Sequence, residues 1–216
     1  SKSTPAPTYT EVFGNTMCEI MERDTRVVAL TAAMPDGTGV DKVLEKFPDR
    51  SFDVGIAEQH AITFCAGMAC EGLKPVAAIY SPFLQRAFDQ VIHDVCLRDI
   101  AYLRGYPNIV LMAPKDEAEL RDMMLTAIEH DGPAALRYPR GNGVGVDISS
   151  PPKLIEIGKA EVLREGGEVA ILALGDMVPA AVQAAEMLAK DGIEATIVNA
   201  RFVKPLDCDL IARLAR

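Results

Sequence analysis

Glu58 lies between a short apolar strand and a helix, in the run Asp53–His60, and is the first candidate for chemistry in this sequence. The helix that follows is rich in small residues, at positions Ala61, Cys65, Ala66, Gly67, Ala69, Cys70 and Gly72. Small side chains let a neighbouring helix approach closely, so we expect this helix to be buried. A buried carboxylate without a partner is costly, so Glu58 needs either a protein partner or a ligand. The alternative is an ordinary first-turn acid that the helix dipole favours.

Two arginines are candidates for binding a phosphate, because the forked guanidinium group matches phosphate oxygens. Arg86 lies inside a predicted helix, and Arg140 lies in the glycine-rich turn that runs on to Gly145. Backbone N–H groups in such a turn can form a nest for an anion. The alternative for Arg86 is a solvated helix face or an ion pair with Asp89.

The composition excludes several classes of function. The chain has 216 residues, a net charge of −9 and no basic run, so nucleic acid is not an expected partner. Its five cysteines form no Cys-x-x-Cys pair, which indicates reduced thiols in a cytosol-like compartment. No apolar stretch is long enough to cross a bilayer, and the first residues do not form a signal peptide.

Strand-like and helix-like segments alternate, which predicts an α/β fold with a mainly parallel sheet flanked by helices. Strands are expected at 27–31, 51–54, 75–80, 108–113, 134–138, 168–174 and 193–199. Helices are expected near 9–22, 40–46, 57–72, 82–97, 116–130 and 177–190, and from 206 onward. Pro151-Pro152 predicts a boundary between a first domain, 1–150, and part of a second α/β domain, 151–216.

Six segments together resemble the 1-deoxy-D-xylulose-5-phosphate synthase family, whose members are transketolase-like thiamine-diphosphate enzymes. The resemblance extends over nearly the whole chain. The Gly-Ile-Ala-Glu-Gln core is shared with several thiamine-diphosphate families. The run from Tyr80 to Arg86 and the Pro-Arg-Gly-Asn loop together narrow the resemblance to the synthase family. The segments are 31–39, 53–63, 74–90, 91–95, 137–142 and 201–207.

The resemblance implies that residues 1–150 form the pyrimidine-binding domain and that Glu58 is the catalytic carboxyl group, hydrogen-bonded to the cofactor's pyrimidine ring. It places Phe83 where an aromatic ring stacks on the pyrimidine, with Ile56 and Met34 lining the same pocket; core packing explains these two nearly as well. The implied ligands of the acceptor substrate are Tyr80, Arg86 and Arg140.

The implied reaction joins pyruvate to glyceraldehyde 3-phosphate with loss of CO2, giving the precursor of isoprenoids, thiamine and pyridoxol. Thiamine diphosphate is the implied cofactor. Mg²⁺ is expected on an amino-terminal diphosphate-binding domain that would act in cis or in trans. A homodimer in the cytoplasm, or in the plastid stroma of a plant or alga, is also implied.

In the family, a strand and a long glycine-rich loop follow the helix that corresponds to 82–97. Here the sequence passes from Arg98 to Asp99 into what resembles the segment beyond that loop. Either the protein lacks the loop, or it has a loop that this sequence does not include, and we expect the second. We expect this chain to be inactive alone. The alternatives are a transketolase, a 2-oxoacid dehydrogenase beta subunit, which Arg86 and the Pro-Arg-Gly-Asn loop argue against, and a non-catalytic assembly or regulatory piece.

Overall fold

The computed structural model describes residues 6–90 and 108–215. The chain divides into two compact units, and each is described by itself. The N-terminal unit consists of the described residues of Pro7–Pro107 together with Arg140–Asn142. The C-terminal unit consists of the described residues of Ser1–Ala6, Asn108–Pro139 and Gly143–Arg216. None of the described helices is both long and apolar enough to span a bilayer.

The N-terminal unit has a three-stranded sheet in the order β2-β1-β3, with every neighbouring pair parallel. Parallel neighbours need crossover connections, which the intervening helices provide. The elements are α1 (Tyr9–Arg23), β1 (Val27–Thr31), α2 (Pro35–Thr38), α3 (Asp41–Lys46), η1 (Pro48–Arg50), β2 (Ser51–Asp53), α4 (Glu58–Cys70), β3 (Lys74–Ala78), α5 (Ser81–Leu84), η2 (Gln85–Ala87) and α6 (Phe88–Gln90).

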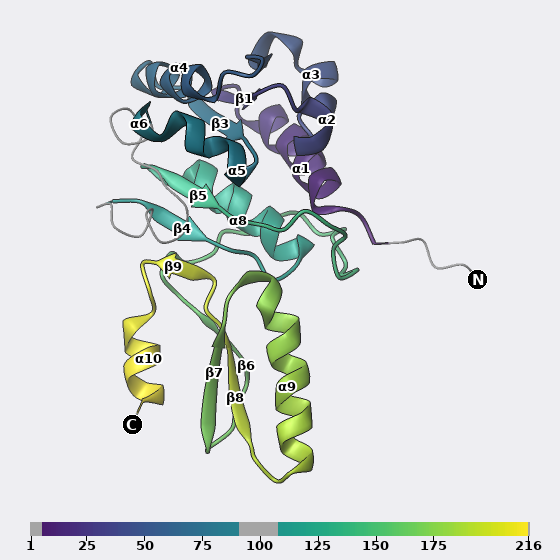
Figure 1. The fold of residues 1–216 in the computed structure, drawn as a ribbon, viewed down its shortest axis with the longest axis vertical. Helices are drawn as coiled ribbons and strands as arrows, with labels where there is room; N and C mark the ends of the chain where they lie inside the picture. Colours follow the sequence, from purple (N-terminus) through teal and green to yellow (C-terminus); the bar gives the residue numbers. More distant parts are fainter. Residues whose placement is uncertain (1–5, 91–107, 216) are drawn as a thin grey trace, which may run out of the picture. The chain divides into compact units, whose positions relative to one another are not determined.

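Strand β1 is the centre of this unit, and all five of its residues are buried. Such a continuously buried strand, with four apolar residues and Thr31, is typical of a parallel sheet that is covered on both faces. Val28 and Leu30 pack against Cys65 and Met68 of α4. Helix α1 also contacts β1, and Figure 1 shows α1 and α4 flanking β1 and β3.

The N-terminus of α1 is fixed by a capping box. Thr8 accepts a hydrogen bond from the backbone of Glu11, whose carboxylate accepts one from Thr8 N–H in return. Gly14 of α1 touches the turn after α2, where a Cβ at this position would lie 2.4 Å from Gly39 O. The sequence needs glycine here because the two backbones are in contact.

The C-terminal unit has two sheets, in the orders β5-β4-β9 and β6-β8-β7. Pairs β4–β5 and β7–β8 are parallel, and pairs β4–β9 and β6–β8 are antiparallel. Figure 1 shows α9 lying along β8, where Ala181 and Ala185 pack on Ile197. The elements are β4 (Val110–Met112), α8 (Glu117–Glu129), β5 (Ala134–Leu136), β6 (Glu161–Arg164), β7 (Val169–Ala173), η4 (Gly175–Met177), α9 (Val178–Lys190), β8 (Ala195–Asn199), β9 (Phe202–Lys204) and α10 (Cys208–Leu214).

The predicted α/β class with mainly parallel strand pairs is confirmed. The single helix expected over 82–97 is wrong for its described part, because 81–90 consists of three short pieces, α5, η2 and α6. The middle piece is a 3₁₀ turn, which winds more tightly than an α-helix and is used in short lengths. Residues 91–97 and the join at 98–99 lie outside the described residues.

Helix α4 is buried on one face only. Ala61, Ile62 and Cys65 are buried, whereas Gly67 and Cys70 are exposed. The expectation that this helix is buried therefore holds for one face of α4 only, the face that meets the sheet. The boundary expected after residue 150 stays a prediction.

Candidate active site

The candidate site lies at the carboxyl ends of β1, β2 and β3 in the N-terminal unit. The chain runs from β1 to β2 on one side and then crosses to β3 on the other side of β1. In open α/β sheets, ligands bind outside the carboxyl ends of the strands where the order changes direction in this way. Met34 follows β1, Glu58 follows β2 and Tyr80 follows β3, so topology brings three predicted site residues to one edge.

Glu58 is the first residue of α4, and only 2% of its surface is exposed. Its Oε1 accepts a hydrogen bond from Arg86 Nη1 at 2.8 Å, in an ion pair whose arginine side chain is 53% exposed. The partner that a buried carboxylate requires is therefore Arg86. Asp89, the alternative partner considered from the sequence, is not the residue that Arg86 is seen to pair with. Glu58 Oε2 accepts no hydrogen bond recorded among the described residues, and a carboxylate oxygen has room for one.

A chain of side-chain contacts continues from this ion pair. The Arg86 guanidinium lies over the Phe83 ring, 5.3 Å from its centroid. The Phe83 and Tyr80 ring centroids are 6.2 Å apart, and the Arg140 guanidinium lies 5.7 Å from the Tyr80 ring centroid. The structure thus brings together five residues singled out from the sequence.

Tyr80 has a second contact that the sequence did not indicate. Its hydroxyl donates a hydrogen bond to Gly37 O at 2.8 Å. A Cβ at Gly37 would lie 2.6 Å from that hydroxyl, so glycine is required for the contact. Tyr80 therefore anchors α2, the short helix after β1, and its oxygen keeps the capacity to accept a hydrogen bond.

Met34 and Ile56 occupy the loops that follow β1 and β2. Met34 is half-buried, whereas Ile56 is 77% exposed, the largest exposed fraction among the exposed large apolar residues of the described chain. Core packing, the alternative considered for both, does not account for Ile56. An exposed apolar side chain two residues before a buried carboxylate is suited to covering a ligand ring.

The glycine-rich turn that begins at Arg140 is divided between the two units. Arg140 belongs to the N-terminal unit, where Tyr9 N–H donates to Gly141 O at 3.0 Å and Thr8 bridges to Asn142. The predicted nest of backbone amides exists further along, in the C-terminal unit. It holds a protein carboxylate, that of Glu117.

Glu117 begins α8 and is fully buried. Its carboxylate accepts hydrogen bonds from the backbone N–H groups of Val144, Gly145 and Val146 at 3.0, 2.6 and 3.2 Å. A Cβ at Gly143 would lie 2.4 Å from the Glu117 carboxyl carbon. The expected anion nest is therefore formed by these three amides, but its anion is the protein's own Glu117 carboxylate. Only the spacing of glycines could have indicated the tight approach.

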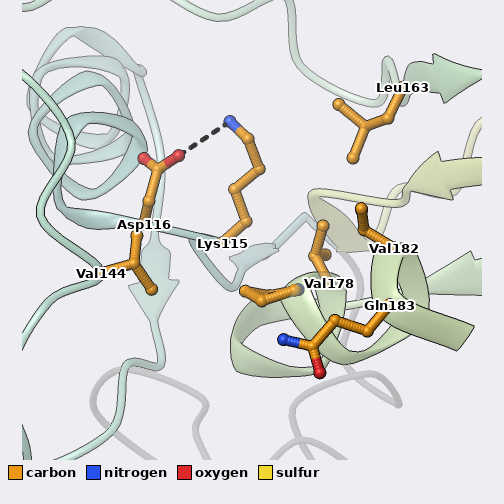
Figure 2. A pocket seen from close by; sticks show the side chains of 8 residues that line it. Lys115, Asp116, Val144, Leu163, Val178, Val182 and Gln183 are labelled. Atoms are coloured by element: carbon orange, nitrogen blue, oxygen red, sulfur yellow. Dashed lines mark ion pairs between the residues drawn. The ribbon is translucent and has the colours of Figure 1, made fainter. Parts of the chain in front are cut away.

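The C-terminal unit contains a pocket of its own. Its volume is about 350 Å³, and apolar side chains such as Leu163, Val178 and Val182 line it. Figure 2 shows its Lys115 amine turned to the Asp116 carboxylate, 3.2 Å away. Burial opposes the charge on Lys115, but the carboxylates of Glu119 and Asp116 outweigh it and raise the pKa of Lys115. No predicted site residue lines this pocket.

Two further observations concern possible metal ligands and one buried thiol of the described residues. In residues 6–90 and 108–215, no three His, Cys, Asp or Glu side chains are grouped to hold a metal ion. Burial raises the pKa of the Cys65 thiol to about 12, so this thiol stays protonated near neutral pH.

The family described as "Transketolase, pyrimidine binding domain" matches residues 5–99 and 96–144. The family described as "Transketolase, C-terminal domain" matches residues 158–216. The first match covers more than half of the sequence, so the chain belongs to the transketolase family. The resemblance to transketolase-like enzymes stated from the sequence is confirmed.

Within that family, the chain is similar to proteins named 1-deoxy-D-xylulose-5-phosphate synthase. One from Synechococcus sp. strain JA-3-3Ab is 56% identical over 243 residues, covering 100% of this chain and 37% of the relative. One from Thermomicrobium roseum is 55% identical over 236 residues, covering 97% of this chain and 38% of the relative. The chain thus spans little more than a third of the length of these relatives.

Two solved structures share the fold. One, entitled "Split gene transketolase, inactive beta4 tetramer", has a TM-score of 0.87 and 30% identity, covering 98% of this chain and 77% of that chain. The other, a transketolase mutant from Pichia stipitis, has a TM-score of 0.76 and 16% identity, covering 98% of this chain and 38% of that chain. The second likeness supports the fold alone.

Proposed function

We propose that this chain supplies the pyrimidine half of a thiamine-diphosphate site in a 1-deoxy-D-xylulose-5-phosphate synthase. The carrying observation is the buried Glu58 at the carboxyl edge of the sheet, joined by side-chain contacts to Arg86, Phe83, Tyr80 and Arg140. The synthase relatives at 55 and 56% identity support this reading over a transketolase, whose split-gene neighbour is 30% identical.

The residues at this edge fit an aminopyrimidine. The Phe83 ring offers a flat face, and the exposed Ile56 and half-buried Met34 offer apolar contacts. Glu58 Oε2 is left to accept a hydrogen bond from a ring nitrogen. When bound, thiamine diphosphate supplies the carbon nucleophile that attacks the keto group of pyruvate.

Glu58 has the central chemical role in this proposal. Its carboxyl group would hold a proton at the pyrimidine ring nitrogen of bound thiamine diphosphate, and the ring would supply the base. Aspartate would be one methylene too short for that contact, and the amide of glutamine has no titratable proton to exchange with the ring. Burial keeps water from competing for the same hydrogen bond.

Arg86 has two roles in the proposed site, one toward Glu58 and one toward the acceptor substrate. Arginine has five N–H donors, and Nη1 donates to Glu58. The half-exposed guanidinium keeps further donors for the phosphate of the acceptor, glyceraldehyde 3-phosphate. Arg140 lies above the Tyr80 ring and would bind the same phosphate.

The proposal needs a second module, which would hold the diphosphate with Mg²⁺. The split-gene transketolase neighbour, an inactive beta4 tetramer, supports an assembly in which that module is a separate chain. A homodimer and a cytoplasmic or plastid location stay predictions.

Reconstitution tests the proposed function. The 216-residue chain is mixed with the amino-terminal module of the Synechococcus relative, thiamine diphosphate and Mg²⁺, and supplied with pyruvate and glyceraldehyde 3-phosphate. We expect 1-deoxy-D-xylulose 5-phosphate from the mixture and none from either part alone. Synthase activity of the chain alone, or transfer from a ketose phosphate donor in place of pyruvate, would contradict the proposal.

Replacing Arg140 by alanine should weaken binding of glyceraldehyde 3-phosphate, the acceptor, far more than binding of pyruvate, because only the acceptor carries a phosphate. A hydrogen bond to a charged group contributes about 1.5–3 kcal/mol, which corresponds to about a 10- to 150-fold higher KM for glyceraldehyde 3-phosphate. The KM for pyruvate should change little. Arg164→Ala, which removes an arginine paired with Glu194, is the matched control. Equal losses for both substrates would make Arg140 a structural residue.

A further inference from the structure

We propose that Asp53 is the positioning residue of the pyrimidine pocket, because one of its oxygens fixes the two loops that carry Met34 and Ile56. Asp53 is the last residue of β2 and is paired in register with Thr31, the last residue of β1. This inference rests on the proposed function, and part of its test does not depend on activity.

Two backbone amides share a single acceptor. Asp53 Oδ1 accepts from Ala33 N–H at 2.7 Å and from Gly55 N–H at 2.9 Å. The first amide belongs to the loop after β1 and the second to the loop after β2. The side chain of Asp53 therefore ties together two loops that are more than twenty residues apart in sequence.

Both loops have a left-handed residue at the point where Asp53 holds them. Ala33 has φ +57° and Gly55 has φ +71°. Glycine adopts this region freely, whereas for alanine the left-handed region costs roughly 1–2 kcal/mol. A hydrogen bond to the Ala33 amide offsets part of that cost and keeps the loop in the conformation seen.

Each anchored residue directly precedes a proposed cofactor contact. Ala33 is followed by Met34, and Gly55 is followed by Ile56 and, three residues on, by Glu58. Asp53 itself is exposed and is not seen to contact Glu58 or Arg86. It therefore acts through the loops and does not touch the reacting atoms.

Because both amides donate to the same Asp53 oxygen, variants that keep or remove that oxygen can be compared directly. Asp53→Asn keeps an Oδ1 acceptor, and solvent can accommodate its amide group, so both hydrogen bonds should survive. Asp53→Ala removes both. Asp49→Ala removes an exposed acid four residues earlier and controls for the change in charge.

The first measurement is amide hydrogen exchange in the chain by itself. We expect Asp53→Ala to exchange faster than wild type at Ala33 and Gly55, with exchange in β1 unchanged. Asp53→Asn and Asp49→Ala should match wild type. Because this readout needs neither cofactor nor activity, it separates failure of the anchoring from failure of the proposed function.

The second measurement is the apparent affinity for thiamine diphosphate in the reconstituted assembly. Asp53→Ala should weaken it by about tenfold or more, since two backbone hydrogen bonds to the Asp53 carboxylate are lost. At saturating cofactor, kcat should stay within about twofold of wild type, because the bound ring restores the loops. Asp53→Asn should behave as wild type in both respects.

Two results would overturn the proposal. Wild-type cofactor affinity in Asp53→Ala would show that the loops need no anchor. Equal loss in Asp53→Asn and Asp53→Ala would show that the negative charge, and not the shared oxygen, is what the site requires. A urea titration of each variant separates either result from general unfolding.

Discussion

Glu58→Gln is expected to abolish turnover while the fold survives. Glutamine keeps the size of the side chain and an oxygen that can accept from Arg86, but it cannot exchange a proton with the cofactor ring. Loss of a positioned acid–base group lowers rates by about 10²- to 10⁴-fold. The measurement is kcat of the reconstituted assembly at saturating cofactor.

The control for this variant is Glu71→Gln, which removes the same charge at the exposed C-terminal end of α4. Turnover of that control should equal wild type, and circular dichroism should be the same for all three proteins. Comparable turnover in Glu58→Gln, with the fold unchanged, would remove Glu58 from the catalytic role.

Glu117→Ala is expected to have the largest effect on stability. The three amides of Val144, Gly145 and Val146 would lose their acceptor at a fully buried position. Hydrogen bonds to a charged group contribute about 1.5–3 kcal/mol each, but water can reach the exposed side of this turn, so we expect a total loss of about 2–4 kcal/mol. Urea denaturation measures the free energy of unfolding.

A second variant perturbs the same contact from the other side, without removing the Glu117 side chain. Gly143→Ala would place a methyl group against the Glu117 carboxyl group and should also destabilise the chain. Glu186→Ala, an exposed acid on α9, should change stability by less than about 0.5 kcal/mol. If Glu117→Ala lowers the free energy of unfolding no more than Glu186→Ala does, water satisfies the amides and the carboxylate does not hold the turn.

The arrangement around Glu58 was largely predictable because it depends on local order along the chain. Alternating strands and helices place the residues after β1, β2 and β3 at one sheet edge, and the family motif supplied their roles. The Glu58–Arg86 ion pair was harder to predict. It depends on how the segment 81–90 breaks into short turns, which helical periodicity does not reveal.

The contacts that the sequence did not indicate join residues far apart in the chain. Strand β9 pairs with β4 about ninety residues away, and no local pattern marks that partner. From the sequence, Glu117 is indistinguishable from an ordinary acid in the first turn of a helix, and only the structure shows its amide partners. Asp53 did carry a local signal, since an aspartate two residues before a glycine is typical of a side-chain turn, but its second partner at Ala33 was not visible.

The central claim is that this chain binds the pyrimidine end of thiamine diphosphate. Calorimetric titration of thiamine diphosphate with Mg²⁺ into the amino-terminal module, with and without the 216-residue chain, tests it most directly. The account predicts weak or undetectable binding by the chain alone, and binding by the mixture that is at least about tenfold tighter than by the module, a gain of about 1.4 kcal/mol. The same affinity with and without the chain would contradict the claim.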